Sequence, residues 1–466
     1  MRKPHVVILG AGFGGLTAAR HLAKVPVTVT LIDRRNHHLF QPLLYQVATA
    51  ALNPSDIAYP IRAAVAKQKN TRVLLAEATG IDVDARVVHL DGGDLAYDYL
   101  IVATGATHSY FGKDWGKVAP GLKSVEDALE MRRRIFLAYE AAEREIDPEK
   151  QREWLTFAVV GGGPTGVELA GALGEIGLYT LANDFRAIDP SNVRVLLFEA
   201  GDRVLQSYAP KLSEAAKEAL EKRQVEVRLN TMVTGIGDSG ITVKDGGGEE
   251  HIGTHTVLWA AGVRASRLGA SLGVERDKAG RVLVEKDLSI PNHPEVFVIG
   301  DLARMMNADG TQVPGVAQGA LQGGKFVAKI IASEVAGKCA RPAFAYHDKG
   351  NMATIGRLSA VIETKRFAKS GFLAWMLWWA VHIMFLVGFR NRLLAMFQWA
   401  WSWVSYTRGA RLITGSVGKL PALSAITPDG EPATHGAQEV IALPPDLCAA
   451  ERAAARPKPS ETHAPV

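Results

Sequence analysis

Two glycine-rich turns carry the residue types and spacings best suited to chemistry in this chain. The first has glycines at positions 10, 12 and 15, and Asp33 follows the next apolar run. Glycines at this spacing let a strand turn tightly into a helix and let a pyrophosphate approach the backbone. The helix N-terminus stabilises the phosphate charge, and the acid hydrogen-bonds the ribose hydroxyls. Because strand, turn, helix and acid occur in order, the segment predicts a dinucleotide-binding βαβ unit rather than an isolated glycine loop.

The same pattern restarts at residue 157. Its glycines stand at 161, 163 and 166, and its acidic residue is Glu199. A carboxylate in this place accepts two ribose hydroxyls and repels a 2′-phosphate, so the second unit is expected to prefer NAD(H) to NADP(H), although Arg203 weakens this preference. Glu199 follows Gly166 by 33 residues, which is longer than usual, so residues 179–192 are expected to extend the helix and its loop.

The two units share a further pair of glycines. Gly105 closes an apolar run 95 residues after Gly10, and Gly262 closes another run 101 residues after Gly161. The same order of elements at nearly the same spacing is an internal repeat. The repeat predicts two dinucleotide-binding folds in one chain, with their dinucleotides held face to face.

A later stretch adds a carboxylate and two amides. An apolar strand, 296–299, is expected to end at Gly300 and Asp301, which would complete the first unit from far along the sequence, as is common where FAD is built into a fold. Gln318 and Gln322 lie four residues apart in a helix expected after Pro314, so they share one helical face. They either line a ligand site or are amides on an ordinary helix. The small residues around them, which would let a flat ligand approach, are Ala317, Gly319, Ala320 and Gly323.

The hydrophobic pattern places these residues on an α/β scaffold. Apolar strands are expected before each glycine turn and each acid, with a helix after each turn. A charged helical stretch at 124–153 separates the two units. Residues 36–49 are too apolar for a solvent-exposed loop and fit either a cofactor cover or packing between domains. The expected strands are 6–9, 27–32, 97–103, 157–160, 193–198 and 256–260, and the first helix is expected at 16–24.

Composition narrows the class of protein. With 466 residues, 47% hydrophobic and 22% charged, the chain can form two or three domains with substantial cores. A net charge of +5 fits an anionic membrane surface or an anionic cofactor. A nucleic-acid partner is not expected, because the sequence has no arginine-rich tract. The two cysteines, Cys339 and Cys448, form no C-x-x-C pair, which argues against a dithiol redox centre. The first strand starts too early for a signal peptide, so cytosolic exposure is expected.

The C-terminal part changes character. Residues 372–389 contain no formal charge, and six of the nine tryptophans lie between Trp375 and Trp403, with Arg408 and Arg411 just beyond. Tryptophan and arginine beside apolar helices are typical of a bilayer interface. The pattern fits one spanning helix or, preferably, two interfacial helices joined at 388–392; a dimer interface is a further interpretation. Residues 421–466 hold 8 of the 22 prolines and are expected to be a disordered tail.

Five segments together resemble the type II (non-proton-pumping) NADH:quinone oxidoreductases, within the two-dinucleotide-binding flavoprotein superfamily. They are NHHLFQPLLYQVAT, GGGPTGVELAG, GDLA, AQGALQGG and HIMFLVGFRNR, and the resemblance covers about residues 5–415. It implies an α/β fold of glutathione-reductase type, with two Rossmann-like domains and amphipathic C-terminal helices on the membrane. It also implies FAD in the first unit, NADH in the second, a quinone beneath the helix after Pro314, and a homodimer peripherally attached to the cytoplasmic face of the inner membrane.

The resemblance assigns residues to roles. Glu168, expected in the first helical turn, either complements the helix dipole or supplies protons, and His382 is a proton relay, an interfacial histidine or a packed one. Gln318 and Gln322 are the candidate quinone contacts, and these four residues form the candidate catalytic set. The expected cofactor contacts are Gly10, Gly12, Gly14, Gly15, Asp33, Arg34, Thr104, Gly105, Gly161, Gly163, Pro164, Thr165, Gly166, Glu168, Glu199, Ala261, Gly262, Gly300, Asp301, Ala317 and Gln318.

The same resemblance divides the chain into domains. Residues 1–120 and 291–365 are expected to form the FAD-binding domain, the second part carrying the quinone-site helix. Residues 121–290 are expected to form the NADH-binding domain with a helical connector at 121–156, followed by membrane-anchoring helices at 366–415 and a Pro- and Ala-rich tail at 416–466.

Two other functions are compatible with a double dinucleotide fold. A sulfide:quinone oxidoreductase shares the flavin, the quinone and the membrane helices, but it needs redox cysteines beside the flavin, and this chain has two distant cysteines. A non-catalytic NADH-binding flavoprotein that acts as a redox-dependent interaction partner is disfavoured by the quinone motif and the membrane segment.

Overall fold

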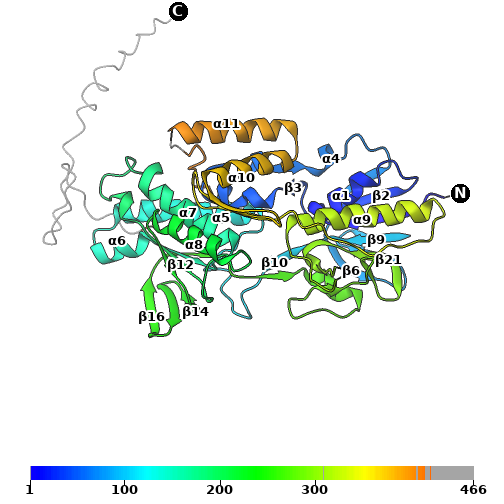
Figure 1. Ribbon diagram of the computed structural model, residues 1–466, viewed down its shortest axis with the longest axis horizontal. Coiled ribbons are helices and arrows are strands. Elements are labelled where there is room, and N and C mark those ends of the chain that lie inside the picture. The colour runs from blue at the N-terminus through cyan, green and yellow to red at the C-terminus, as the bar shows by residue number, and fades with distance from the viewer. Residues whose placement is uncertain (1, 308, 406–407, 415–419, 421–466) are drawn as a thin grey trace, which may run out of the picture. The chain divides into compact units, whose positions relative to one another are not determined.

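The computed structural model describes residues 2–307, 309–405, 408–414 and 420. Residues 1–422 form one compact unit (Figure 1). Apart from Leu420, the tail predicted at 416–466 lies outside the described residues.

A six-stranded sheet forms the first core. Its strand order is β20-β21-β9-β1-β2-β5, and all neighbours are parallel except β20 and β21. Continuous apolar runs produce it because a parallel sheet is buried on both faces. β21 pairs with β9 from about two hundred residues away in sequence, so the late segment completes the first dinucleotide fold. The bounds are β1 His5–Leu9, β2 Thr28–Asp33, β5 Thr71–Leu75, β9 Tyr99–Val102, β20 Ser289–Ile290 and β21 His293–Val298.

Two helices lie side by side against this sheet, α1 (Phe13–His21) and α9 (Ala317–Val335) (Figure 1). They approach closely through glycines. A Cβ on Gly324 would lie 2.2 Å from the carbonyl oxygen of Gly14, so any side chain there would force the helices apart.

The small residues of α9 serve this packing. Gly319 is buried against Val313, and Gly323 is buried against Ile299. The expectation that these two glycines keep a surface low for a flat ligand is therefore wrong, because their faces are filled by protein.

A second, four-stranded parallel sheet has the order β13-β12-β11-β17. In both sheets the first strand of the unit lies between the strand that ends in the acid and the strand that ends in the later glycine, which confirms the internal repeat. A three-stranded antiparallel sheet, β14-β15-β16, packs beside it. The bounds are β11 Thr156–Val160, β12 Arg194–Phe198, β13 Val225–Arg228, β14 Met232–Gly237, β15 Gly240–Asp245, β16 Gly248–Gly253 and β17 Thr256–Trp259.

The helices of the second unit include α7 (Pro164–Glu175), α8 (Pro210–Glu221) and the connector helices. α7 continues into a π-helical turn, η2 (Ile176–Thr180), so the predicted extension of this helix is confirmed. The charged connector forms two helices rather than one, α5 Val125–Arg144 and α6 Pro148–Trp154, each starting at a side-chain cap provided by Ser124 and Asp147.

Smaller elements join the two sheets. β10 (Ala106–His108) pairs with β18 (Val263–Ala265). From Ala265 onward the chain packs again in the first core, so it returns to the first domain earlier than residue 291, where the second part of the FAD-binding domain was expected to begin. The others are β3 His37–Leu39, η1 Gln41–Leu43, α2 Leu44–Ala48, α3 Pro54–Ile57, β4 Ala58–Pro60, α4 Ile61–Ala64, β6 Ala78–Asp82, β7 Val87–Leu90, β8 Gly93–Ala96, η3 Pro190–Asn192, η4 Arg267–Leu272, β19 Val282–Leu283, η5 Gly300–Leu302 and β22 Ala303–Arg304.

The C-terminal third adds a three-stranded antiparallel sheet and two helices along one edge (Figure 1). β23 (Asn351–Thr354), β24 (Ala360–Glu363) and β25 (Ala368–Gly371) precede α10 (Phe372–Phe385) and α11 (Phe389–Ser405). The apolar run thus breaks after Phe385. Among the described residues, no helix is long and apolar enough to cross a membrane, so the single-spanning interpretation is wrong. The break falls at 386–388, slightly before the predicted joint.

Candidate active site

The first glycine turn has room for a ligand at one position and none at the others. Gly10 has φ +95°, and a Cβ on Gly15 would lie 1.8 Å from the carbonyl oxygen of Gly10. A Cβ on Gly12 would meet nothing within 4 Å, so this position faces open space. Asp33 accepts a hydrogen bond from the backbone N–H of Ala11 at 2.7 Å, which places its carboxylate beside the turn.

The second turn repeats this geometry. Gly161 has φ +105°, and a Cβ on Gly166 would again lie 1.8 Å from the preceding turn carbonyl, while Gly163 faces open space. Glu199 accepts from the N–H of Gly162 at 2.6 Å and from that of Gly201 at 2.8 Å. Two turns of the same shape, each with an open glycine and an acid beside it, fit two dinucleotides.

The other residues predicted near the turns have varied roles. The Gly14 carbonyl faces Gly324 where α1 and α9 cross closely. Pro164 occupies the first turn of α7, where its missing N–H costs nothing, and Thr165 follows it half-buried. Arg34 is well exposed, 3.9 Å from Glu77. Arg203 lies 3.7 Å from Asp202 and donates to the backbone of Gln206.

The later residues of each unit border the same space. The Thr104 hydroxyl is buried with no hydrogen-bond partner among the described residues, and Gly105 has φ +66° with open space beyond its Cα. The residue that carries this orphaned hydroxyl packs beside Gly10 of the first glycine turn, which fits the FAD that the first unit is expected to hold. Gly262, next to Ala261, accepts from the Ser109 N–H at 3.1 Å, which ties the two units together.

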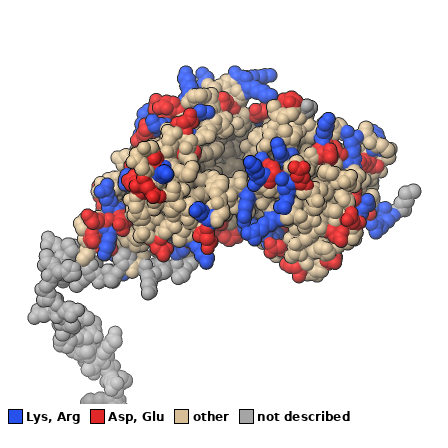
Figure 2. All heavy atoms as spheres, turned by 90° about the horizontal axis from the view of Figure 1, so that it is seen from below, with Lys and Arg blue, Asp and Glu red and all other residues tan. Residues whose placement is uncertain are grey.

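The strand end at Gly300 brings a carboxylate to the start of α9. Gly300 has φ +70°, and a Cβ on Gly315 would lie 3.8 Å from the Asp301 carboxylate. α9 begins at Ala317, two residues after the predicted Gly315. On the face of the molecule away from α11, Figure 2 shows a hollow between the parts that carry the two sheets.

The two glutamines of α9 differ in their contacts. The Gln322 side chain donates to the His347 carbonyl and accepts from the His347 N–H, both at 2.9 Å. This pair fixes the chain before β23 to α9, so Gln322 has a packing role. Gln318 is half-buried on the same face.

Glu168 lies deeper than the sequence suggested. It is the fifth residue of α7, beyond the first turn, and only 9% of it is exposed. Burial raises the pKa of its carboxyl well above the usual range, opposed in part by a backbone hydrogen bond from Thr354. Its place beyond the first turn argues against the helix-dipole explanation, and its burial favours the protonated carboxyl.

His382 is a packed histidine. Its Nδ1 donates to the Trp378 carbonyl at 2.7 Å, and its ring stacks on the Trp378 ring at 4.2 Å. Burial lowers the pKa of His382 to about 4, so its ring is neutral at physiological pH. This geometry fits the packed interpretation better than the proton relay.

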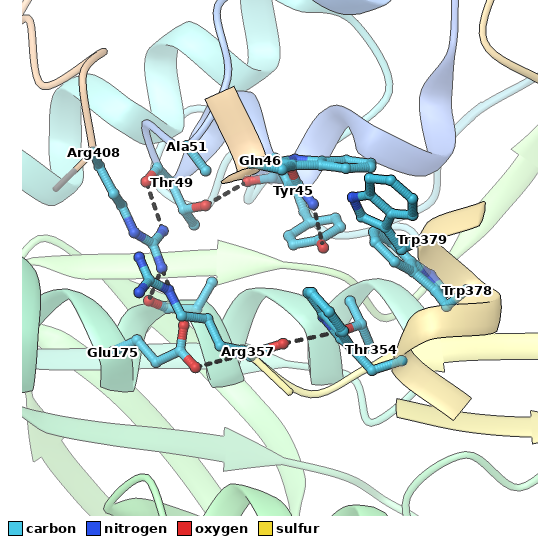
Figure 3. A pocket seen from close by; sticks show the side chains of 14 residues that line it. Tyr45, Gln46, Thr49, Ala51, Glu175, Thr354, Arg357, Trp378, Trp379 and Arg408 are labelled. Carbon is cyan, nitrogen blue, oxygen red and sulfur yellow. Dashed lines mark hydrogen bonds and ion pairs between the residues drawn. The ribbon is translucent and has the colours of Figure 1, made fainter. Parts of the chain in front are cut away.

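A pocket opens beneath α10 and α11. Figure 3 shows an aromatic end formed by Trp378 and Trp379 and a polar end formed by Arg408, Glu175 and Arg357, with Tyr45 and Gln46 of α2 above. The remaining lining residues are Thr49, Ala51, Ala172, Thr354, Gly356, Trp375 and Trp399. The described tryptophans of the two helices thus line the pocket, while the exposed side chains are Phe372, Leu373, Met376, Leu377, Met384, Phe385, Leu393, Met396 and Phe397.

Arg408 forms the polar end with a buried carboxylate. It donates to the Thr49 carbonyl at 2.8 Å and lies 3.4 Å from Glu175, which also accepts from Arg223 at 3.0 Å. Arg411 pairs with Asp184 in the loop after η2. The expectation that both arginines mark a lipid interface is wrong, because they fix the chain after α11 to the second unit.

Sequence reasoning missed Tyr45, Gln46, Trp399 and the Arg408–Glu175 pair as a group. The only signal was the unusual composition of residues 36–49, which left open a cofactor cover or packing between domains. The structure shows the packing: His38 Nδ1 donates to the Ala11 carbonyl in the first glycine turn, and α2 packs on α5. The cofactor cover stays a prediction.

Comparisons with known proteins agree with this geometry. Residues 4–324 match the family model described as pyridine nucleotide-disulphide oxidoreductase, and residues 348–405 match the NDH2 C-terminal domain. The chain is 47% identical to the type II NADH:quinone oxidoreductase Ndh of Mycobacterium tuberculosis, covering 89% of this chain and 91% of that protein. It is 48% identical to NdhA of the same organism, covering 89% and 90%.

Among solved structures, NDH2 from Plasmodium falciparum in complex with NADH superposes with a TM-score of 0.80 at 19% identity, covering 89% of this chain and 100% of that chain. The sulfide:quinone oxidoreductase of Aquifex aeolicus gives 0.68 at 20% identity, covering 84% and 92%. Both share the fold. The matched family models and the relatives with nearly half their residues identical place this chain in the type II NADH:quinone oxidoreductases of the pyridine nucleotide-disulphide oxidoreductase family.

Proposed function

We propose that the chain oxidises NADH at the second glycine turn and passes two electrons through FAD to a membrane quinone without pumping protons. The observation that carries the proposal is the pairing of two matched dinucleotide turns with a pocket beneath two helices that expose apolar side chains.

The chain's part in the first half of the reaction is positioning. The open Gly163 gives the pyrophosphate access to the start of α7, and the Glu199 carboxylate takes the ribose hydroxyls of NADH. Gly12, Asp33, Thr104 and Asp301 hold the FAD, which supplies a two-electron acceptor that can be reoxidised by a second substrate. Holding both dinucleotides rigidly provides the orientation that hydride transfer needs.

Quinone reduction also consumes two protons. Burial raises the pKa of the Glu168 carboxyl and so favours its protonated form. We assign it to proton supply; the Tyr45 and Tyr208 hydroxyls lie near enough to interact electrostatically with its carboxyl. Gln318 does not line the pocket beneath α10 and α11, and we assign it to the part of the quinone path between that pocket and the flavin. Gln322 is assigned to hold the strand segment that carries Thr354 in place.

Membrane attachment is assigned to α10 and α11. Their exposed side chains include Leu373, Met384 and Phe397, which are 68%, 61% and 78% exposed in a single chain. Such an apolar surface is unusual on a protein face that contacts only water, and it suits a peripheral, monotopic contact with lipid. Lys365 and Lys369 stand near the start of α10 and suit anionic headgroups. The cytoplasmic face and the homodimer are proposed from the family alone.

Anaerobic spectroscopy of the purified holoenzyme tests this function. NADH is expected to bleach the flavin absorbance much faster than NADPH, and a ubiquinone or menaquinone analogue is expected to restore it. Bleaching by NADH without reoxidation by any quinone would favour the non-catalytic interaction protein, and bleaching by sulfide instead would favour the sulfide:quinone class.

A further inference from the structure

A hydrogen-bond chain beneath α11 has a fixed direction. The Trp399 Nε1–H donates to the Gln46 Oε1 at 2.6 Å, and the Gln46 Nε2 donates to the Tyr45 hydroxyl at 2.8 Å. An indole nitrogen only donates, so the Gln46 oxygen must face Trp399 and the amide nitrogen must face Tyr45. The Tyr45 oxygen therefore accepts in this chain, and its single hydrogen must point elsewhere.

That hydrogen is free to point into the pocket. Tyr45 lines it and is only 6% exposed, and among the described residues nothing accepts its O–H. Figure 3 shows the Tyr45 ring in the space between Gln46 and Thr354. Trp378 lines the same pocket and is 2% exposed, and its Nε1 has no partner among the described residues. Two buried donors without acceptors are costly unless a ligand satisfies them.

The charge of the pocket decides what kind of acceptor fits. The free donors are a phenol and an indole, both neutral; burial raises the Tyr45 pKa well above its usual range, so the phenol keeps its proton. Two cationic groups line the pocket, and neither is free: Arg408 already donates to two backbone carbonyls and to Glu175, and Arg357 also has an interaction of its own. A neutral carbonyl oxygen therefore suits this site better than a phosphate, and the indoles of Trp375, Trp378, Trp379 and Trp399 suit a flat ring.

We propose that this pocket holds the quinone ring by its carbonyl oxygens, that Tyr45 and Trp378 are the hydrogen-bond donors, and that Gln46 and Trp399 are positioning residues that aim the Tyr45 hydroxyl. The inference rests on the proposed function, since it names how that function's acceptor is bound. It also gives α11 a second role: the helix that contacts lipid sets the direction of a donor in the substrate pocket.

Replacing Tyr45 with Phe removes one donor and keeps the ring. With a short-tailed ubiquinone analogue, we expect KM to rise about five- to tenfold, the value of one neutral hydrogen bond. The rate of flavin reduction by NADH is expected to stay unchanged. Quenching of tryptophan fluorescence by the same analogue, measured without turnover, should weaken by the same factor. Tyr139→Phe is the matched control, because among the described residues the buried Tyr139 hydroxyl has no partner and does not line this pocket, so its loss should leave quinone kinetics as they are.

Gln46→Glu tests the direction of the chain. An ionised carboxylate accepts from both Trp399 and Tyr45, so the Tyr45 hydrogen turns away from the pocket although its hydroxyl remains. The rise in quinone KM should match that of Tyr45→Phe. The variant that carries both substitutions should have a quinone KM no higher than that of either single variant. Between about pH 9 and about pH 6 the defect should shrink, because the introduced carboxyl, once protonated, donates to Tyr45 as the amide does.

Three outcomes would overturn the proposal. Unchanged quinone KM and quenching in Tyr45→Phe would remove the donor role. Additive effects of Tyr45→Phe and Gln46→Glu on quinone KM would show that Gln46 does not act through the Tyr45 hydroxyl. Inhibition by phosphatidylglycerol micelles that competes with quinone in the wild type and vanishes in Tyr45→Phe would assign the pocket to lipid. If the wild type itself failed to turn over quinone, the proposed function would fail instead, which separates the two results.

Discussion

The glycine turns and the pocket beneath α10 and α11 are built in opposite ways. Each turn gathers its strand, glycines, helix and acid from one βαβ unit, and its contacts are made by backbone. The pocket brings together α2, the end of α7, the segment after β23 and both C-terminal helices, and its contacts are made by side chains. The turns therefore depend on a local backbone shape, whereas the pocket depends on how distant segments dock.

The largest expected effect is the loss of stability when Gly166 is replaced, which a replacement of Gly163 in the same turn should not cause. Gly166→Ala would place a Cβ 1.8 Å from the Gly161 carbonyl oxygen, so unfolding free energy should fall by at least about 3 kcal/mol and NADH binding should be lost. Gly163→Ala meets no protein atom within 4 Å, so it should keep wild-type stability and still lose NADH affinity. Urea unfolding and NADH titration check both. Equal destabilisation by the two variants would contradict the assignment of Gly163 to the ligand.

A smaller effect is expected where the C-terminal segment docks. Arg408→Leu leaves Glu175 with Arg223, so we expect a loss of about 2 kcal/mol of unfolding free energy together with a weakened quinone site. Arg411→Leu is the control, because its pair with Asp184 is partly exposed and should contribute less than about 1 kcal/mol. The same urea assay, with quinone KM, measures both. An Arg408 variant as stable as the Arg411 variant would show that the buried pair does not fix α11.

Glu168 should make stability fall as pH rises. Its folded pKa lies above its unfolded pKa, so the folded state binds the proton more tightly; the stabilisation is complete below the unfolded pKa and is lost as pH rises toward the folded one. Glu168→Gln removes this dependence, so its stability relative to the wild type should increase as pH rises above the unfolded pKa of about 4.3. Thermal melting across that range checks the prediction, and a pH–rate profile identical to the wild type would remove the proton-supply role.

The smallest effect is expected at His382. Its lowered pKa of about 4 keeps the ring neutral, so His382→Gln should leave the pH–rate profile unchanged between about pH 6 and about pH 8. Steady-state turnover over that range measures it. Loss of a profile limb in the variant would restore the relay interpretation.

The difference between the two regions also explains what the sequence could predict. The glycine spacing and the acids predicted both dinucleotide turns and their repeat, because a tight turn excludes other residues. The same reasoning placed Glu168 at a helix start and Arg408 at a lipid interface. The sequence shows neither the burial of Glu168 nor the pairing of Arg408 with Glu175, because both arise only when distant segments pack together. Gln46 and Trp399 are separated by 353 residues, and only docking of α11 on α2 joins them.

Separate measurement of the two half-reactions tests the central claim most directly. In stopped-flow experiments on Gln318→Ala, we expect NADH to reduce the bound flavin at the wild-type rate, while reoxidation by a ubiquinone analogue slows and needs more quinone. If reduction by NADH slowed as much as reoxidation by quinone, the two substrates would not have the separate sites assigned to them here.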